Sequence, residues 1–272
     1  MIDILMSTYN GSRFISEQLD SIIAQTFSDF RLIVRDDGST DNTRDIIGEY
    51  ARNDERISLI DDKLGNLGAA RSFMRLAEIS TSSHIMFADQ DDVWLPDKVK
   101  TSYEKIVEMA AFHGNNKPLL VFTDLTVVGE ALNEINASMW QYQRLEPDIS
   151  ADWRTLLAQN VVTGCTIIAN RAAVDAALPF DLNEMLHDHW LAVNTARLGN
   201  IAYLKEPTVL YRQHRVNVAG SISYDSNYAL SKMSSPLERY AFYKKAAAHF
   251  GDVSAVGIAA RKISANLKRL FR

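Results

Sequence analysis

The sequence contains very little cysteine and no long apolar segment. Cys165 is the single cysteine in 272 residues, which excludes an internal disulfide and fits a reducing compartment. No run of about 18 consecutive apolar residues occurs, so no membrane-spanning helix is predicted. Asp3 and Asn10 interrupt the apolar N-terminus, so no signal-peptide core is predicted either. We therefore expect a cytoplasmic protein.

The sequence also lacks a strong charge imbalance and the common phosphate-binding loops. A net charge of −5 gives no reason to expect nucleic-acid binding. The turn after the first predicted strand lacks G-x-G-x-x-G, and G-x-x-x-x-G-K-[ST] is absent, which disfavours a dinucleotide-binding Rossmann domain and a P-loop NTPase. The length suits one large domain, or one domain with an appendage.

Strand-like and helix-like segments alternate along the first part of the chain. Strands are predicted at 2–7, 30–34, 57–60 and 85–88, and helices at 13–26, from Thr40 or Asp41, at 69–80 and at 97–112. This alternation predicts a parallel sheet with helices on both faces. Ligands bind beyond the carboxyl ends of such strands, so the polar clusters at 7–10, 36–39 and 89–92 are expected to line one crevice.

The acidic cluster directly follows a short buried strand. Asp89, Asp91 and Asp92 occur within four positions. So many carboxylates at a strand end are unfavourable unless a cation is present or some of them point into solvent. A divalent ion held by one or two carboxylates, with water and phosphate oxygens completing its shell, suits the pattern. A solvated polar turn is the other interpretation.

The second half is less periodic. An acidic residue at a helix start tends to stay ionised, and Asp188 lies at the start of a predicted helix. His187 and His189 flank it, but no further Cys/His cluster supports a zinc site.

Strands are predicted at 119–125, at 161–168 with a break at Gly164, at 201–204 and at 209–211; 126–150 is predicted as a loop with one short helix, and 153–159, 236–250 and 255–272 as helices.

Four segments, taken in order, resemble the inverting family 2 glycosyltransferases with the GT-A fold. They are Met6–Gly11, Val34–Asp41, Gly65–Gly68 and Ala88–Pro96. The resemblance covers about residues 1–215, and the Asp-Gln-Asp-Asp-Val-Trp run places it nearest to the bacterial rhamnosyltransferase-like branch that builds surface polysaccharides.

This resemblance implies a Rossmann-like α/β fold with a mostly parallel sheet, helices on both faces and additional C-terminal helices. The glycosyltransferase domain would span 1–215, with a nucleotide-binding half at 1–112 and an acceptor and donor-sugar half at 113–215. Residues 216–272 would form a mobile loop and a helical appendage.

The resemblance also implies roles for individual residues. Asp188 matches the general base, although His187 replaces the acidic residue that precedes it in the family motif, and Glu184 is the fallback base. Asp91 and His214 would hold Mg²⁺ or Mn²⁺, and Arg212 or Arg215 would neutralise the leaving group. Contacts with the donor nucleotide-sugar are implied for Ser7, Thr8, Tyr9, Asn10, Asp37, Arg71, Asp89, Gln90, Gly164 and Arg212.

The expected activity is metal-dependent, inverting transfer of a sugar from a nucleotide-sugar to a saccharide or lipid-linked acceptor in surface polysaccharide synthesis. The favoured donor is dTDP-L-rhamnose, and a UDP-hexose or UDP-HexNAc is the alternative. A nucleotidyltransferase is disfavoured because it would need a basic Gly-rich phosphate loop near the N-terminus. A non-catalytic binding module is disfavoured because both a metal cluster and a base are retained.

The predicted C-terminal helix is amphipathic and basic. No acidic residue follows Asp252. Such a helix can lie on an anionic bilayer, so peripheral contact with the inner membrane face is one expectation; packing on the catalytic domain or on a second copy is the other. Its apolar face is Val256, Ala259, Ala260, Ile263, Leu267, Leu270 and Phe271, and its basic residues are Arg261, Lys262, Lys268, Arg269 and Arg272.

Overall fold

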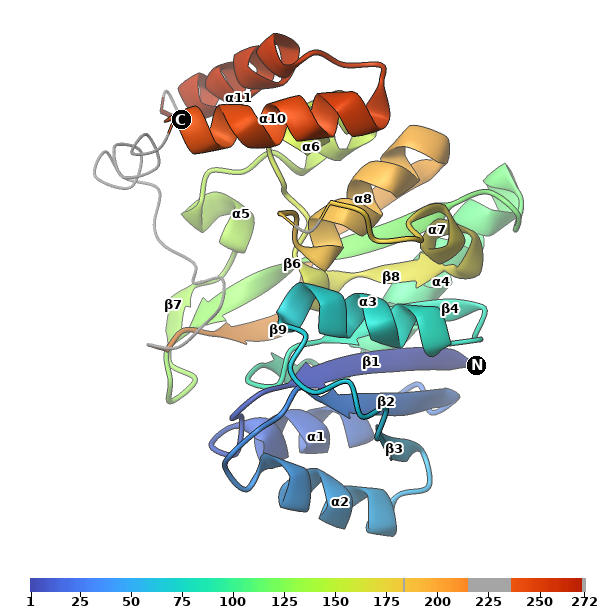
Figure 1. The fold of residues 1–272 in the computed structure, drawn as a ribbon. Helices are drawn as coiled ribbons and strands as arrows, with labels where there is room; N and C mark the ends of the chain where they lie inside the picture. Colours follow the sequence, from blue (N-terminus) through green and yellow to red (C-terminus); the bar gives the residue numbers. More distant parts are fainter. Residues whose placement is uncertain (183, 215–235, 271–272) are drawn as a thin grey trace.

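The computed structural model describes residues 1–182, 184–214 and 236–270. Figure 1 shows a central sheet with helices on both faces and a pair of antiparallel helices at one end. The first part alternates as expected: β1 (Ile2–Thr8), α1 (Ile15–Ile23), β2 (Phe30–Asp36), α2 (Thr43–Asn53), β3 (Ile57–Ile60), α3 (Ala69–Ile79) and β4 (His84–Ala88).

Shorter elements follow the acidic cluster. They are β5 (Val93–Trp94), α4 (Lys98–His113), β6 (Leu119–Val128), β7 (Glu134–Asn136), α5 (Met139–Tyr142), the 3₁₀ turn η1 (Pro147–Ala151), α6 (Trp153–Ala158), the 3₁₀ turn η2 (Gly164–Thr166), β8 (Ile168–Asn170), α7 (Arg171–Ala176), α8 (His187–Leu198), β9 (Asn200–Arg212), α10 (Pro236–Phe250) and α11 (Ala255–Leu270).

The sheet order is β3-β2-β1-β4-β8-β6-β9-β5, with β7 paired to β6. The strands β3, β2, β1 and β4 are mutually parallel, and β6 and β9 are parallel to each other, whereas β8 is antiparallel to both of its neighbours. Thr8 pairs with Asp36, and Met6 pairs with Ala88, so the turns after β1, β2 and β4 lie side by side. The predicted α/β fold with a largely parallel sheet is confirmed.

Both faces of the sheet are covered, which explains the continuous apolar runs in the strands. In β1, Ile4 packs with α1, α2 and α4, while Leu5 packs on the opposite face with α3, α6 and α8. The side chains of β4 alternate in the same way: Met86 packs on the face with α1, α2 and α4, and Phe87 packs on the face with α3, α6 and α8. Each such side chain, fully buried, stabilises the fold by about 1.5–3 kcal/mol.

Three predictions about the second half were wrong in detail. Residues 161–168 do not form one strand, because η2 interrupts them and β8 begins only at Ile168. The Thr166 hydroxyl donates to the Thr163 carbonyl at 2.7 Å, a local bond that competes with strand pairing. The strands predicted at 201–204 and 209–211 are one strand, β9, and the predicted loop at 126–150 begins with the end of β6 and contains β7.

The C-terminal helices pack onto the main core. Ala246 and Phe250 of α10 and Ile258 of α11 are buried in the same apolar cluster as Trp153 and Trp190. The domain division at residue 215 stays a prediction, and the predicted loop at 216–235 lies outside the described residues. None of the helices among the described residues combines the length and apolar character needed to cross a bilayer.

Candidate active site

A cleft of about 840 Å³ lies at the carboxyl ends of the strands. Its volume falls in the range of small-molecule sites, about 300–1,000 Å³. The cleft brings together most of the residues singled out in the sequence. Its lining includes Ser7, Thr8, Tyr9, Asn10, Asp37, Asp89, Gln90, Asp91, Gly164, Asp188 and His214.

The turns after β1 and β2 are held by hydrogen bonds between them. The Thr8 hydroxyl donates to Asp36 at 3.0 Å, and the Asn10 side-chain oxygen accepts from the Thr40 N–H at 2.8 Å. Asn10 has φ 48°, a left-handed conformation that asparagine tolerates well. Gln90 then joins this turn to β4, because its amide exchanges two hydrogen bonds with the backbone of Tyr9, at 2.9 and 3.0 Å.

Asp37 lines the cleft and also holds a neighbouring turn in place. Its two carboxylate oxygens accept from the backbone N–H groups of Leu67 and Gly68, at 2.7 and 2.8 Å, and it is ion-paired with Arg35. The Arg35 guanidinium also bonds Asp62 at 3.0 Å. The aspartate therefore fixes the 65–68 turn at the edge of the cleft.

The acidic cluster fits a hard divalent cation. His214 Nε2 lies 2.6 Å from Asp91 Oδ2, so a nitrogen and a carboxylate oxygen converge where β9 ends beside the acidic loop. The pKa of Asp89 is raised to about 7, mainly by burial and in addition by the negative charges of Asp91 and Asp188. A cation here would relieve that repulsion, and oxygen ligands with one imidazole suit Mn²⁺ or Mg²⁺.

A deeper group of possible ligands fits such an ion less well. Asp89, Asp92 and Cys165 place ligand atoms within 4.8 Å of one another. Burial, together with Asp92 and Asp89, raises the pKa of the Cys165 thiol well above its ordinary value, so the thiol stays protonated. Asp92 Oδ1 accepts from the backbone N–H of Arg212 at 3.1 Å, which ties β9 to the acidic loop.

Asp188 projects from the first turn of α8 into the same cleft. Its carboxylate accepts from the backbone N–H of His189 at 2.6 Å and from that of Gly164 at 3.2 Å. Burial raises its pKa to about 6, which the two backbone donors offset only in part. A carboxylate of this kind is ionised at neutral pH and is a stronger base than an exposed aspartate.

Residue 164 must lack a side chain because it packs closely against the start of α8. A Cβ at this position would lie 2.9 Å from His187 Nε2 and 3.5 Å from Asp188 Cβ. The absent side chain thus allows η2 to approach the start of α8 and to donate its N–H to the base. The sequence linked this glycine to close approach, but it placed the residue in a strand.

His187 is a cleft residue that the sequence did not single out as a ligand-binding group. It is 8% exposed, and its ring stacks on Phe73 with centroids 4.1 Å apart and meets Phe87 edge-on. Neither ring nitrogen has a hydrogen-bond partner among the described residues. Burial lowers its pKa to about 3, so the imidazole is neutral. The sequence feature that could have identified His187 is its position next to Asp188, the candidate base.

Three predicted site residues do not line the cleft. Arg71 is exposed on α3. Arg212 is buried and directs its guanidinium to the Asp91 carbonyl at 2.8 Å, to the Glu130 carbonyl and to Glu17 at 2.6 Å, so it braces the acidic loop. Glu184, the fallback base, is ion-paired with Lys245 of α10. Arg215 lies outside the described residues.

The sheet with helices on both faces and the cleft at its carboxyl edge form a GT-A-like fold. Residues 3–116 match the family described as Glycosyl transferase family 2. The chain thus contains a family 2 glycosyltransferase domain over these residues, and the family and enzyme class predicted from the sequence are confirmed. The dTDP-rhamnosyl transferase RfbG of Shigella flexneri is 29% identical over 239 residues, which cover 82% of this chain and 76% of that protein.

Solved structures agree on the fold. S. aureus TarS 1–349 in complex with UDP-GlcNAc has a TM-score of 0.64 at 17% identity, over 99% of this chain and 72% of that one. The mannosyltransferase PcManGT from Pyrobaculum calidifontis, in complex with GDP-Man and Mn²⁺, has a TM-score of 0.59 at 16% identity, over 99% of this chain and 73% of that one.

Proposed function

We propose that the protein is a metal-dependent, inverting glycosyltransferase in which Asp188 is the general base. The observation that carries the proposal is the shared cleft: Asp188 and the Asp91–His214 pair both line it, and both carboxylates act on the pKa of Asp89. A base and a cation site on one cleft suit transfer from a nucleotide-sugar, because one deprotonates the acceptor while the other faces the leaving group.

The chemistry is a single displacement. The acceptor hydroxyl attacks the anomeric carbon, the bond from that carbon to the pyrophosphate oxygen breaks, and the nucleoside diphosphate leaves. Asp188 takes the hydroxyl proton as the new C–O bond forms. A divalent ion at Asp91 and His214 would offset the negative charge that develops on the pyrophosphate. Attack from the opposite face inverts the anomeric centre.

The sugar is expected to meet His187 and Gly164. The buried imidazole is neutral and offers one donor and one acceptor to sugar hydroxyls, while the glycine leaves room beside the base. The nucleoside is expected along the Ser7–Asn10 turn and Asp37, at the other end of the lining. Arg212 acts by positioning Asp91 and is withdrawn as a contact of the leaving group.

The favoured donor is dTDP-L-rhamnose. It is supported by the Asp-Gln-Asp-Asp-Val-Trp run and by the similarity to a dTDP-rhamnosyl transferase. A UDP-hexose or UDP-HexNAc is the second candidate, supported by the fold shared with a protein solved with UDP-GlcNAc.

The acceptor is proposed to be a saccharide or a lipid-linked saccharide at the cytoplasmic face of the membrane. Support comes from the single buried cysteine, which fits a reducing compartment, and from the basic C-terminal helix.

Incubation of the purified protein with labelled dTDP-L-rhamnose, UDP-glucose and UDP-GlcNAc, with Mn²⁺ and a panel of saccharide acceptors, tests these assignments. Sugar transfer with inverted configuration is expected, fastest from dTDP-L-rhamnose. Transfer only from a UDP-sugar would reverse the donor order. Pyrophosphate release would indicate a nucleotidyltransferase, and binding without turnover would indicate a non-catalytic module.

A further inference from the structure

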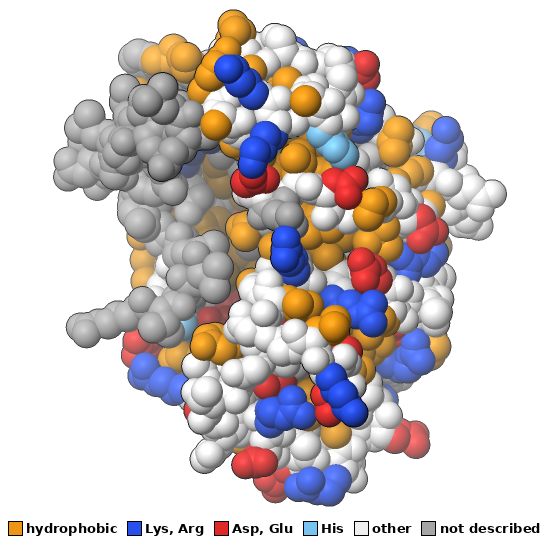
Figure 2. All heavy atoms as spheres, viewed as in Figure 1, with side chains coloured by type: hydrophobic (Ala, Val, Ile, Leu, Met, Phe, Trp, Pro, Cys, Tyr) orange, Lys and Arg blue, Asp and Glu red, His pale blue; other side chains and the backbone are white. Residues whose placement is uncertain are grey.

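The amphipathic helix α11 packs on the protein with its less apolar side. Ile258 is buried, and Arg269 is buried with its guanidinium donating to the Gln143 carbonyl at 3.0 and 2.6 Å. The larger described side chains of the apolar row predicted from the sequence face outward instead, whereas Ala259 packs against the core. Val256, Ile263, Leu267 and Leu270 are 66%, 61%, 49% and 45% exposed. Figure 2 shows single apolar side chains and basic side chains interspersed on the surface at this end of the molecule.

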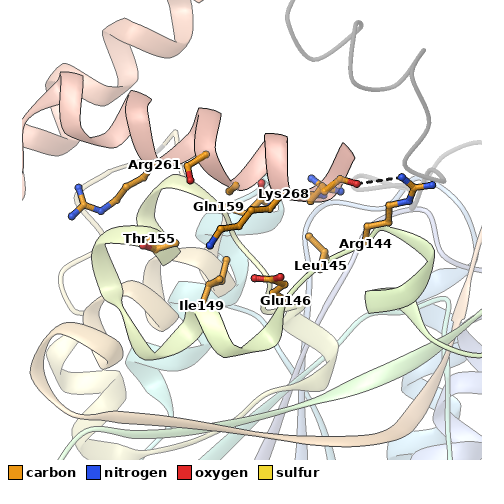
Figure 3. Close-up of a pocket in the computed structure, with 11 residues that line it drawn as sticks. Arg144, Leu145, Glu146, Ile149, Thr155, Gln159, Arg261 and Lys268 are labelled. Atoms are coloured by element: carbon orange, nitrogen blue, oxygen red, sulfur yellow. Dashed lines mark hydrogen bonds between the residues drawn. The ribbon is translucent and has the colours of Figure 1, made fainter. Parts of the chain in front are cut away.

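A second cavity, of about 110 Å³, lies beneath the same helix. It is formed between α11 and residues 144–159, and it shares no lining residue with the active-site cleft. In Figure 3, Lys268 reaches from α11 into the middle of the cavity toward Thr155 and Ile149, with Arg261 at one end and Arg144 at the other. The space suits a phosphate-sized group and is too small for a nucleotide-sugar.

Three cations around this cavity have no carboxylate partner among the described residues. Arg144 donates to the backbone carbonyl of Arg269 at 3.2 Å, and Arg261 makes a 3.5 Å contact with that of Gly257. Lys268 forms neither a hydrogen bond nor an ion pair with the described residues. Glu146 is the one acidic residue in the lining. Like charges gathered in this way repel one another, so the cavity favours an anion.

We propose that this cavity binds the phosphate group of an anionic lipid while the outward row of α11 enters the bilayer surface. One helix presents cations around a phosphate-sized cavity and an apolar row on its free side, and an amphipathic lipid matches both. A free phosphate ion would leave the apolar row in water. The inference rests on the acceptor proposed above, at the cytoplasmic face of the membrane, and gives the protein a binding site for that surface.

Vesicle co-sedimentation tests the inference directly. The intact chain is expected to bind phosphatidylglycerol vesicles more tightly than phosphatidylcholine vesicles, and less tightly at high salt. The cavity variant Arg144→Gln/Lys268→Gln should bind about 30-fold more weakly, since two surface cations are lost. The row variant Ile263→Ser/Leu267→Ser should also bind more weakly. The matched control, Lys100→Gln/Lys117→Gln, removes two exposed lysines outside the cavity and should bind as the intact chain does.

Three outcomes would overturn the inference. Equal loss of binding in the control and the cavity variant would show that only net charge matters. Binding of inorganic phosphate in calorimetry without vesicle binding would make the cavity a site for soluble anions. A dimer that the row variant converts to a monomer, with no vesicle binding, would make the row an interface between two copies. Transfer to a soluble acceptor is measured in parallel, so failure of the lipid site is distinguished from failure of the proposed activity.

Discussion

Replacing the proposed base is expected to remove activity and, at the same time, to make the fold less sensitive to rising pH. Burial raises the pKa of Asp188 from its ordinary 3.8 to about 6. A folded-state pKa above the unfolded value means that the folded protein binds this proton more tightly, so ionising the carboxyl costs stability. The cost is absent below about pH 4, grows as the pH rises toward 6 and is complete above that value.

The size of the effect follows from the shift. Two pKa units correspond to about 3 kcal/mol. Asp188→Asn removes the charge but keeps a single oxygen, whereas the N–H groups of His189 and Gly164 donate to different carboxylate oxygens, at 2.6 and 3.2 Å. One of these two hydrogen bonds is therefore lost in the variant at every pH. The stability of the variant relative to the wild type should therefore rise by up to about 3 kcal/mol between pH 4 and pH 8, on top of a pH-independent loss of about 1–3 kcal/mol from the broken hydrogen bond.

Urea unfolding of both proteins in EDTA, without donor, at several pH values between 4 and 8 measures this difference. In parallel, kcat should fall by about 10²–10⁴-fold, the range for loss of general-base help. The kcat/KM of the wild type should fall about tenfold per pH unit below about pH 6. A stability difference that does not change with pH, or that moves against the variant as the pH rises, would refute the burial argument. Retained activity would place the base elsewhere.

Three further substitutions separate the roles in the cleft. Asp91→Asn should abolish transfer, and EDTA should silence the wild type until Mn²⁺ or Mg²⁺ is added; full turnover in EDTA would exclude the metal role. Gly164→Ala should lower kcat/KM by one to two orders of magnitude, because the new Cβ would lie 2.9 Å from His187 Nε2 and would displace both the imidazole and the Asp188 carboxylate; steady-state kinetics check this. Glu184→Gln should leave kcat unchanged, since its carboxylate is paired with Lys245 outside the cleft; an inactive protein would restore Glu184 as a candidate base.

Local pattern was enough to predict the first half of the fold. Apolar runs, such as Leu119–Phe122 and Ile85–Ala88, alternate with helical spacing, and sheets covered on both faces require such runs. Parallel strands bring their carboxyl ends to one edge, so the polar turns after β1, β2 and β4 could be placed together before the structure was known. The ordered motifs in those turns carried the family resemblance.

The roles within the cleft depended on contacts that no local pattern encodes. His214 reaches Asp91 across 123 residues only because β9 lies between β6 and β5. Arg212, which the sequence placed on the donor, turns its guanidinium to backbone carbonyls of the neighbouring loops. The neutral state of His187 follows from its burial between two phenylalanine rings, which spacing cannot show.

The C-terminal helix shows which properties the sequence determined by itself and which only the tertiary structure decided. Helical periodicity alone determined that Val256, Ile263 and Leu267 share a face, because a residue advances by about 100° around the axis wherever the helix lies. Which face meets the protein was decided by the surface that receives it. Ile258 enters the apolar cluster with α6 and α10, and Arg269 reaches the Gln143 carbonyl. The apolar row is left outside because those contacts, spread over distant parts of the chain, fix the rotation of the helix about its axis.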